Sequence, residues 1–257
     1  MIELPIKSIE AVNQNPKKLA FISHPKIGKT SLLSKLQNCL IIDLEDSAEF
    51  YGGLFVNVVK IAKEKNISML EAYKLVIQSL EEQKKNNGGK PVYDYIALDS
   101  ITVLQDIAKE LALILYRQTA MGKAFSGTDI TLLPQGGGEG WLRSAFEKLY
   151  SPLSNYCNKC LILAGHVKAA SINKNGQDIS ALDINLRGQL KLITTSQMDA
   201  IGFMFRDKGT QNNIMSFKGH EQNLIAGSRC HHLSGQEFVI SELKDKELIT
   251  YWDKIFI

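Results

Sequence analysis

One stretch of the chain places a glycine, a lysine and a threonine at a spacing that suits phosphate binding. Residues 23–33 read SHPKIGKTSLL, which follows the pattern G-x-x-x-x-G-K-[ST] with Ser23 in the place of the first glycine. In such a loop the backbone amides point at the phosphates, and the helix that follows favours anions. Gly28 lets the backbone approach closely, Lys29 reaches the β- and γ-phosphates, and Thr30 offers a hydroxyl to Mg²⁺. The predicted nucleotide-binding residues are Ser23, His24, Pro25, Lys26, Ile27, Gly28, Lys29, Thr30 and Ser31.

A carboxylate ends a second apolar stretch. Residues 95–100 read YIALDS, so Asp99 follows a run that is typical of a buried strand. An Asp at this position predicts a ligand that holds Mg²⁺ through its water shell, together with Thr30. The alternative role of Asp99 is to cap the helix that follows, and the two roles are compatible.

Three carboxylates follow the apolar residues 39–42. Residues 41–47 read IIDLEDS and contain Asp43, Glu45 and Asp46. In an active site one of them is the general base that orients an attacking water, whereas on a plain surface the segment is a solvated acidic turn. The residue types leave both interpretations open and do not select one carboxylate.

A histidine and a basic segment follow another apolar run. Residues 161–170 read LILAGHVKAA, where His166 either senses the γ-phosphate or ends a strand without a ligand. Residues 159–191 hold five Lys or Arg and two Asp, and they include SINKNGQDIS. We predict a mobile loop that binds a phosphate backbone, with a solvated loop as the alternative. The candidate DNA-binding residues are Lys168, Lys174, Arg187 and Lys191.

Two further stretches have less specific signals. Residues 133–143 read LPQGGGEGWLR, and three consecutive glycines predict a hinge, a tight loop or a close backbone approach. We expect Trp141 in the core, with contact to nucleic acid by Trp141 and Arg143 as the alternative. Arg229 lies in a predicted turn, where it is either a surface residue or an arginine finger that reaches a neighbour's nucleotide.

The cysteines do not favour a metal or redox site. Cys157 and Cys160 form a lone C-x-x-C, in which the first ends a predicted helix and the second begins a predicted strand. Cys230, His231 and His232 would complete a zinc site only by chance proximity.

Alternating apolar strands and helices are expected to position these residues. We predict strands over 18–23, 39–43, 95–99 and 160–165, and helices over 30–38, 68–85, 101–117 and 141–155. The second helix has a capping box made by Ser68 and Glu71. Strands over 200–206, 213–218 and 237–241 follow with little helix between them. The pattern predicts an α/β fold whose mostly parallel central sheet is flanked by helices and continued by antiparallel C-terminal strands.

The composition is that of a soluble globular chain. The 257 residues are 44% hydrophobic and 22% charged, with a net charge of +3, which is too small to argue nucleic-acid binding by itself. We see no apolar run of membrane-spanning length and no secretory signal, so we expect a cytoplasmic protein without membrane contact. Four cysteines do not suggest a disulfide scaffold. We expect a single domain over residues 1–257, with its core at about 18–241.

The order of these motifs resembles the RecA-like P-loop ATPases, in particular the short, phage-encoded, single-domain RecA/RadA-like proteins linked to single-strand annealing and recombination. The resemblance covers nearly the whole chain. It is carried by PKIGKTSL, IIDLEDS, YIALDS, PQGGGEGWLRSAF, LILAGHVK, LRGQLKLITTSQMDAIGFMFR and AGSRCHHL.

The resemblance implies roles for individual residues. Glu45 corresponds to the catalytic glutamate, and Asp99 with Ser100 to the metal-binding pair. His166 corresponds to the residue that senses the γ-phosphate, and Arg229 to the arginine finger. The segment from Lys168 to Arg187 falls where the family has a mobile loop that faces DNA.

The resemblance also implies a function. We expect a Mg²⁺-dependent ATPase that binds single-stranded DNA in phage-type recombination or annealing inside a bacterial host. It would assemble into a ring or filament, with a single-strand-binding protein as a candidate partner. Two other interpretations stay open: a P-loop kinase or clock-type regulatory ATPase that needs no DNA, and a nucleotide-gated interaction module without catalysis.

Overall fold

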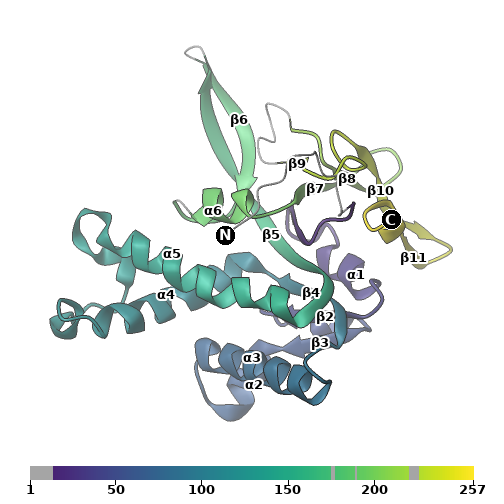
Figure 1. The fold of residues 1–257 in the computed structure, drawn as a ribbon. Coiled ribbons are helices and arrows are strands. Elements are labelled where there is room, and N and C mark those ends of the chain that lie inside the picture. Colours follow the sequence, from purple (N-terminus) through teal and green to yellow (C-terminus); the bar gives the residue numbers. More distant parts are fainter. Residues whose placement is uncertain (1–13, 175–176, 189, 220–225) are drawn as a thin grey trace, which may run out of the picture.

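The structure, a computed structural model, describes residues 14–174, 177–188, 190–219 and 226–257 (Figure 1). Parallel strands form its centre. Each pairs in parallel with at least one other of them. They are β1 (Lys18–Ser23), β2 (Cys39–Asp43), β3 (Leu54–Asn57), β4 (Tyr93–Asp99), β5 (Cys157–Lys174) and β7 (Ala200–Arg206).

Antiparallel strands extend this sheet. They are β6 (Gln177–Ile184), β8 (Asn213–Ser216), β9 (Gly227–Ser228), β10 (Glu237–Lys244) and β11 (Glu247–Thr250). Over the described residues the sheet has 11 strands, in the order β11-β10-β8-β7-β1-β5-β4-β2-β3, with β6 added to β5 and β9 to β7. The predicted fold class is therefore confirmed. The single domain over residues 1–257 stays a prediction.

Helices cover both faces of the sheet (Figure 1). They are α1 (Lys29–Ser34), α2 (Val58–Lys65), α3 (Met69–Asn86), α4 (Ile101–Arg117), α5 (Gly137–Tyr150) and α6 (Leu190–Ser196). Short 3₁₀ turns occupy Ala48–Phe50, Gly122–Ala124, Ile130–Leu132, Pro134–Gly136, Ser151–Tyr156 and Trp252–Lys254. Among the described residues, no helix is both long and apolar enough to span a bilayer.

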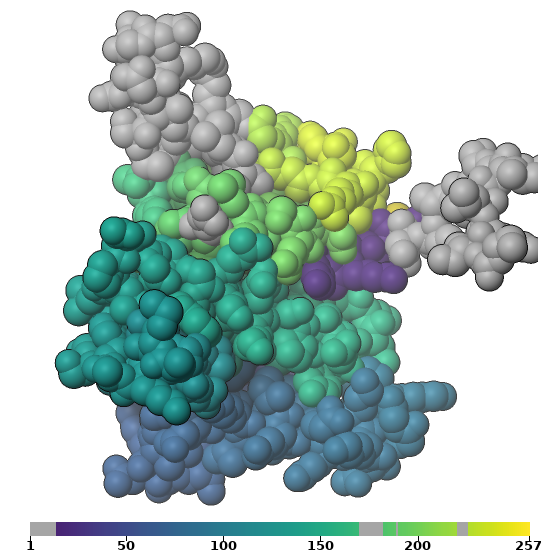
Figure 2. All heavy atoms as spheres, turned by 60° about the vertical axis from the view of Figure 1, so that its left-hand side comes forward, coloured from purple at the N-terminus to yellow at the C-terminus, as the bar shows by residue number. Residues whose placement is uncertain are grey.

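The apolar strands are buried because both of their faces are covered. In β1, Ala20 and Ile22 contribute to the core beneath α2 to α6, whereas Leu19 and Phe21 contribute to the core beneath α1 and the C-terminal Trp252. Since side chains alternate along a strand, a strand buried on both faces needs a continuous apolar run. In the space-filling view, α4 and α5 (teal) lie at the left and the C-terminal strands (yellow) at the upper right, with green segments between them (Figure 2).

Most predicted elements are present, and several differ at their ends. The strands over 18–23, 39–43 and 200–206, the helix over 101–117 and the capping box of α3 are confirmed. The first helix ends at Ser34 rather than at residue 38, and α5 begins at Gly137 rather than at residue 141. The elements β3, α2 and α6 were not predicted.

The segment predicted as a basic loop is instead a β-hairpin, so its predicted secondary structure is wrong, while its phosphate-binding role stays a prediction. Strand β5 continues past the sheet and pairs with β6 from Val167↔Ile184 to Lys174↔Gln177. In Figure 1 this hairpin projects away from the sheet. The missed signal is the Asn-Gly pair at 175–176 between two strand-like segments, which favours a two-residue hairpin loop.

The three-glycine stretch is a close backbone approach, one of its predicted roles. A Cβ on Gly138 would lie 1.9 Å from the carbonyl oxygen of Ile130, so a side chain cannot fit there. Trp141 is half-buried and packs against the core, with its ring centroid 5.7 Å from that of Tyr116, as the core interpretation expects.

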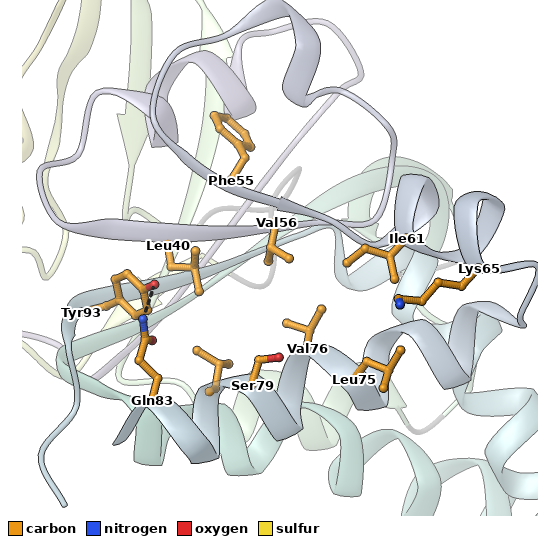
Figure 3. A pocket seen from close by; sticks show the side chains of 11 residues that line it. Leu40, Phe55, Val56, Ile61, Lys65, Leu75, Val76, Ser79, Gln83 and Tyr93 are labelled. Atoms are coloured by element: carbon orange, nitrogen blue, oxygen red, sulfur yellow. Dashed lines mark hydrogen bonds between the residues drawn. The ribbon is translucent and has the colours of Figure 1, made fainter. Parts of the chain in front are cut away.

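An apolar hollow of about 410 Å³ lies between β2, β3 and α3. Figure 3 shows Leu40 and Val56 of the strands facing Leu75 and Val76 of α3 across it, with Lys65 at one end. None of the residues that line it belongs to the phosphate loop or to the acidic strand ends. The hollow is therefore separate from the predicted phosphate-binding and acidic residues, which lie at the carboxyl edge of the sheet.

Candidate nucleotide-binding site

The carboxyl ends of four parallel strands meet at one edge of the sheet. In the register, Ser23 of β1 lies beside His166 of β5, and Asp43 of β2 lies beside Asp99 of β4. The segments that leave these strands carry the residues predicted to do chemistry. In open parallel sheets this edge is where ligands bind.

The phosphate loop tolerates Ser23 without backbone strain. Ser23 is the last residue of β1, is fully buried and lies outside the positive-φ residues. The left-handed positions of the loop are Lys26, with φ of 64°, and Gly28, with φ of 110°. A Cβ on Gly28 would also approach the Asn213 side-chain nitrogen to 3.3 Å. Glycine is therefore required at position 28, whereas the turn that a glycine at 23 would permit is not used.

Lys29 lies at the centre of the site. Its Nζ is 3.2 Å from Ser23 Oγ, 3.4 Å from the His24 carbonyl oxygen and 3.1 Å from His166 Nδ1. Burial lowers the pKa of Lys29, and the charges of Asp99 and Glu45 oppose this. Because an ammonium group only donates, His166 Nδ1 must accept, and its proton is assigned to Nε2.

Glu45 lies on the other side of the His166 ring. Its Oε1 accepts from His166 Nε2 at 2.8 Å and from Ser100 Oγ. Burial alone would raise the pKa of Glu45, but the hydrogen bonds from His166 and Ser100 and the charge of Lys29 lower it overall. With a side chain that is 27% exposed, Glu45 is an ionised carboxylate within reach of water.

The two neighbouring carboxylates have structural contacts. Asp43 is buried and accepts from the backbone N–H groups of Glu45, Ser47 and Ala48 at 2.7–2.9 Å, so it fixes the turn that carries Glu45. Asp46 instead accepts from Asn57 and pairs with Lys63 at 2.9 Å. Of the three carboxylates, Glu45 is the one that joins the Lys29 cluster, so the segment is more than a solvated acidic turn.

Asp99 and Thr30 form the candidate cation site. Thr30 Oγ1 donates to Asp99 Oδ2 at 2.6 Å, while the buried Asp99 Oδ1 has no hydrogen-bond partner among the described residues. A buried, unpartnered carboxylate oxygen beside a hydroxyl fits Mg²⁺, which takes oxygen ligands and is often held by one or two protein groups plus phosphates. Among the described residues, no three or more His, Cys, Asp or Glu side chains gather in a group that could hold a metal ion. The N-cap of α4 is Ser100, so the interpretation of Asp99 as that cap is wrong.

We expect Asp99→Asn to stabilise the protein at high pH when nucleotide and Mg²⁺ are absent. Burial raises the pKa of Asp99 from 3.8 to about 6. Between these values the folded state binds more protons than the unfolded state, so wild-type stability falls as the pH rises through this window. About two pKa units correspond to about 3 kcal/mol at most.

Urea unfolding in EDTA at pH 4 and pH 8 tests this expectation. The gain of Asp99→Asn over wild type should be present at pH 8 and nearly absent at pH 4. Asp106→Asn, at a carboxylate that is 66% exposed on α4, is the matched control and should show no such difference. An equal gain at both pH values would contradict the assignment of the effect to Asp99 ionisation.

Three of the four candidate DNA-binding cations, Lys168, Arg187 and Lys191, lie around the base of the β5–β6 hairpin, and Lys174 is at its far end. Lys168 Nζ donates to the Leu186 carbonyl oxygen at 2.7 Å, and Arg187 Nε pairs with Glu139 at 2.8 Å. Lys191 of α6 pairs with Asp183. The side chain of Lys174 lies outside the described part of the chain. Arg187 and Lys191 therefore have acidic partners within this chain.

Arg229 is remote from this chain's own Lys29. It follows β9, which pairs with the first residues of β7, and its guanidinium contacts the Ser196 carbonyl oxygen at 2.9 Å and Asp199 at 3.7 Å. Ala200 pairs with Leu19, four residues before Ser23 along β1, which is about 13 Å. The arginine-finger role of Arg229 stays a prediction.

The cysteines remain free thiols in the interior of the described chain. Cys160 is fully buried in β5, and Cys157 is half-buried at its start. Burial raises the pKa of Cys157 to about 11, so its thiol is a poor nucleophile at neutral pH.

Known proteins that resemble the chain were found by family and by structure. Residues 15–230 match a protein family described as an AAA domain. Among solved structures, a crystal structure of the RadB recombinase resembles the chain with a TM-score of 0.42 and 12% identity, over 91% of this chain and 90% of that one. That likeness is too distant to support an argument about function. A search of curated proteins finds no match.

Proposed function

The chain belongs to the AAA-domain family, and from this premise we propose that it binds ATP and hydrolyses it with the residues gathered around Lys29. One observation carries the proposal. The His166 ring contacts Lys29 on one nitrogen and Glu45 on the other, beside the Thr30–Asp99 pair. The residues proposed to bind phosphate and to act as the base are thus joined through His166, and the proposed cation ligands are sequence neighbours of Lys29 and of Ser100.

In the proposed reaction, a water oxygen attacks the γ-phosphorus in line with the bond to the ADP oxygen, which breaks. The proton of the water passes to Glu45. Lys29 stabilises the charge that develops on the phosphate oxygens. Thr30 and Asp99 would hold Mg²⁺, which when bound neutralises phosphate charge. His166 would sense the bound phosphate, because the phosphate oxygens would compete with its Nδ1 for the Lys29 ammonium.

Single-stranded DNA is the proposed effector. The β5–β6 hairpin begins directly after His166, and Lys168, Arg187 and Lys191 lie around its base. The ion pair of Arg187 is surface-exposed, and such pairs contribute about 0–1 kcal/mol. Phosphates can therefore replace Glu139 at little cost, with the release of counterions as a further gain. The proposed biological role is recombination or annealing, with self-association into a ring or filament that brings Arg229 to a neighbour's nucleotide.

The experiment is the rate of ATP hydrolysis with and without a long single-stranded oligonucleotide, with Lys29→Ala as the blank. We expect DNA to raise the rate in wild type and not in the blank. We also expect the stimulation to weaken as salt increases, because it depends on phosphate contacts. Arg187→Ala should reduce the stimulation, while the rate without DNA stays within about twofold of wild type.

The other outcomes separate the alternatives. A rate of ATP hydrolysis that the oligonucleotide does not change would contradict coupling to DNA and favour a regulatory ATPase or a kinase. Nucleotide binding without any hydrolysis would contradict the catalytic proposal and favour a nucleotide-gated interaction module.

A further inference from the structure

We infer that Ser100 is a positioning residue that reserves one oxygen of Glu45 for the attacking water. The inference rests on the proposed ATPase function and goes beyond it, because it assigns different tasks to the two oxygens of Glu45. Oε1 is held by the protein, and Oε2 receives the proton.

Two donors converge on the same oxygen of Glu45. Ser100 Oγ and His166 Nε2 both donate to Oε1, and no hydrogen bond to Oε2 is present among the described residues. Each carboxylate oxygen has about two lone-pair sites, so Oε1 has little capacity left. The remaining strong acceptor of this side chain is Oε2.

The Ser100 hydroxyl is committed to this contact. Ser100 is fully buried and stands at the N-cap of α4, where a serine side chain usually accepts from the first turn of the helix. Here its side chain makes no such bond, although its backbone carbonyl accepts from Leu104. The hydroxyl is instead turned toward Glu45.

A backbone contact docks the Glu45 segment to the same turn. The N–H of Leu44 donates to the carbonyl oxygen of Asp99 at 2.7 Å. Leu44 precedes Glu45, and Asp99 precedes Ser100, so the two segments are joined by one backbone bond and one side-chain bond. Together with the three backbone amides that donate to Asp43, these contacts fix the backbone of Glu45. The rotation of the Glu45 side chain is then limited by its hydrogen bonds from Ser100 and His166.

His166 alone cannot fix the Glu45 carboxylate. Its ring also contacts Lys29, and ATP would draw Lys29 toward its phosphates. Ser100 has no such second partner among the described contacts, so its bond to Oε1 can persist through nucleotide binding. In the reaction the water oxygen bonds to the γ-phosphorus, the bond to the ADP oxygen breaks, and the water proton moves to Oε2. Loss of Ser100 would let Oε2 leave the position from which it accepts that proton.

Steady-state hydrolysis by Ser100→Ala tests the inference. We expect kcat to fall about 10- to 100-fold, since misplacement of a reacting group by about 1 Å has effects of this size. The KM for ATP and the melting temperature should stay near wild type. Ser100→Thr, which keeps the hydroxyl, should restore most of kcat. Ser154→Ala, at a hydroxyl of the Ser151–Tyr156 turn, is the control and should match wild type.

The decisive comparison is made in the Glu45→Gln background. If Ser100 acts through Glu45, adding Ser100→Ala should lower the single-turnover rate by less than twofold. Two results would overturn the inference while leaving the ATPase proposal intact. One is a further fall of about 10- to 100-fold in the single-turnover rate when Ser100→Ala is added to Glu45→Gln, and the other is an unchanged kcat in Ser100→Ala alone. A wild-type protein without hydrolysis would instead overturn both. If Ser100→Ala does not fold, Ser100→Cys takes its place, and the same loss is expected because a thiol is a weak donor.

Discussion

Glu45→Gln is expected to lower kcat for ATP hydrolysis by about 10²- to 10⁴-fold, the range that general-base catalysis contributes. An amide has nearly the shape of a carboxylate but cannot take a proton. Hydrogen bonds from Ser100 and His166 would hold the amide oxygen at the place of Oε1. The amide nitrogen would then occupy the place of Oε2 and present a donor where the water needs an acceptor.

The Glu45→Gln measurement needs both a rate and an affinity. The rate of phosphate release should fall, while the Kd for ATP, measured by calorimetry, should change little because Glu45 does not bind phosphate. Glu49→Gln lies in the same acidic segment, is exposed, and should hydrolyse ATP like the parent. If Glu45→Gln also hydrolyses like the parent, Glu45 is not the base.

The sequence could predict which strand ends meet, but not which carboxylate faces the site. Asp43, Glu45 and Asp46 have similar chemistry and lie within four positions. What separates them is the turn, in which Asp43 accepts three backbone amides and Asp46 contacts Asn57 and Lys63. Such contacts depend on residues distant in sequence, so residue type and spacing cannot reveal them. The resemblance to a known family was the signal that selected Glu45.

The apolar strands were predictable because their burial on both faces leaves a continuous apolar run. The strand β3 was not, since its four residues LFVN follow two glycines and are exposed or half-buried at the edge of the sheet. The hairpin was missed because the polar composition of the segment outweighed the Asn-Gly pair in its sequence. The polar composition predicted a flexible loop, whereas the backbones of the two segments pair along eight positions and form strands.

Ser23 departs from the motif without disturbing the loop. A glycine at this position would permit a turn with positive φ, but Ser23 continues the strand β1 in register with His166 and Met204. Its hydroxyl, which glycine lacks, donates to the His24 carbonyl oxygen at 2.8 Å and contacts the Lys29 ammonium. The substitution therefore adds a partner for Lys29 instead of straining the loop.

Lys29→Ala is expected to weaken ATP binding and to lower kcat by about 10²- to 10³-fold, the effect of removing one preorganised donor from a site of developing charge. Lys29 is 5% exposed and lies among Ser23, His24 and His166, so neighbouring water cannot replace its charge. Its loss also leaves the carboxylates of Asp99 and Glu45 without the cation that opposes their repulsion of phosphate.

Thermal or urea unfolding with ATP and Mg²⁺ gives a readout of Lys29→Ala that does not depend on catalysis. At a ligand concentration 100 times Kd, wild type should gain about 2.7 kcal/mol of unfolding free energy. A variant whose Kd is about a hundredfold higher should gain about 0.4 kcal/mol at the same concentration. Lys35→Ala, an exposed lysine at the end of α1, should gain as much as wild type. Equal stabilisation of Lys29→Ala and wild type by ATP would mean that the nucleotide binds elsewhere, because no phosphate held at this loop could be indifferent to the loss of a buried ammonium.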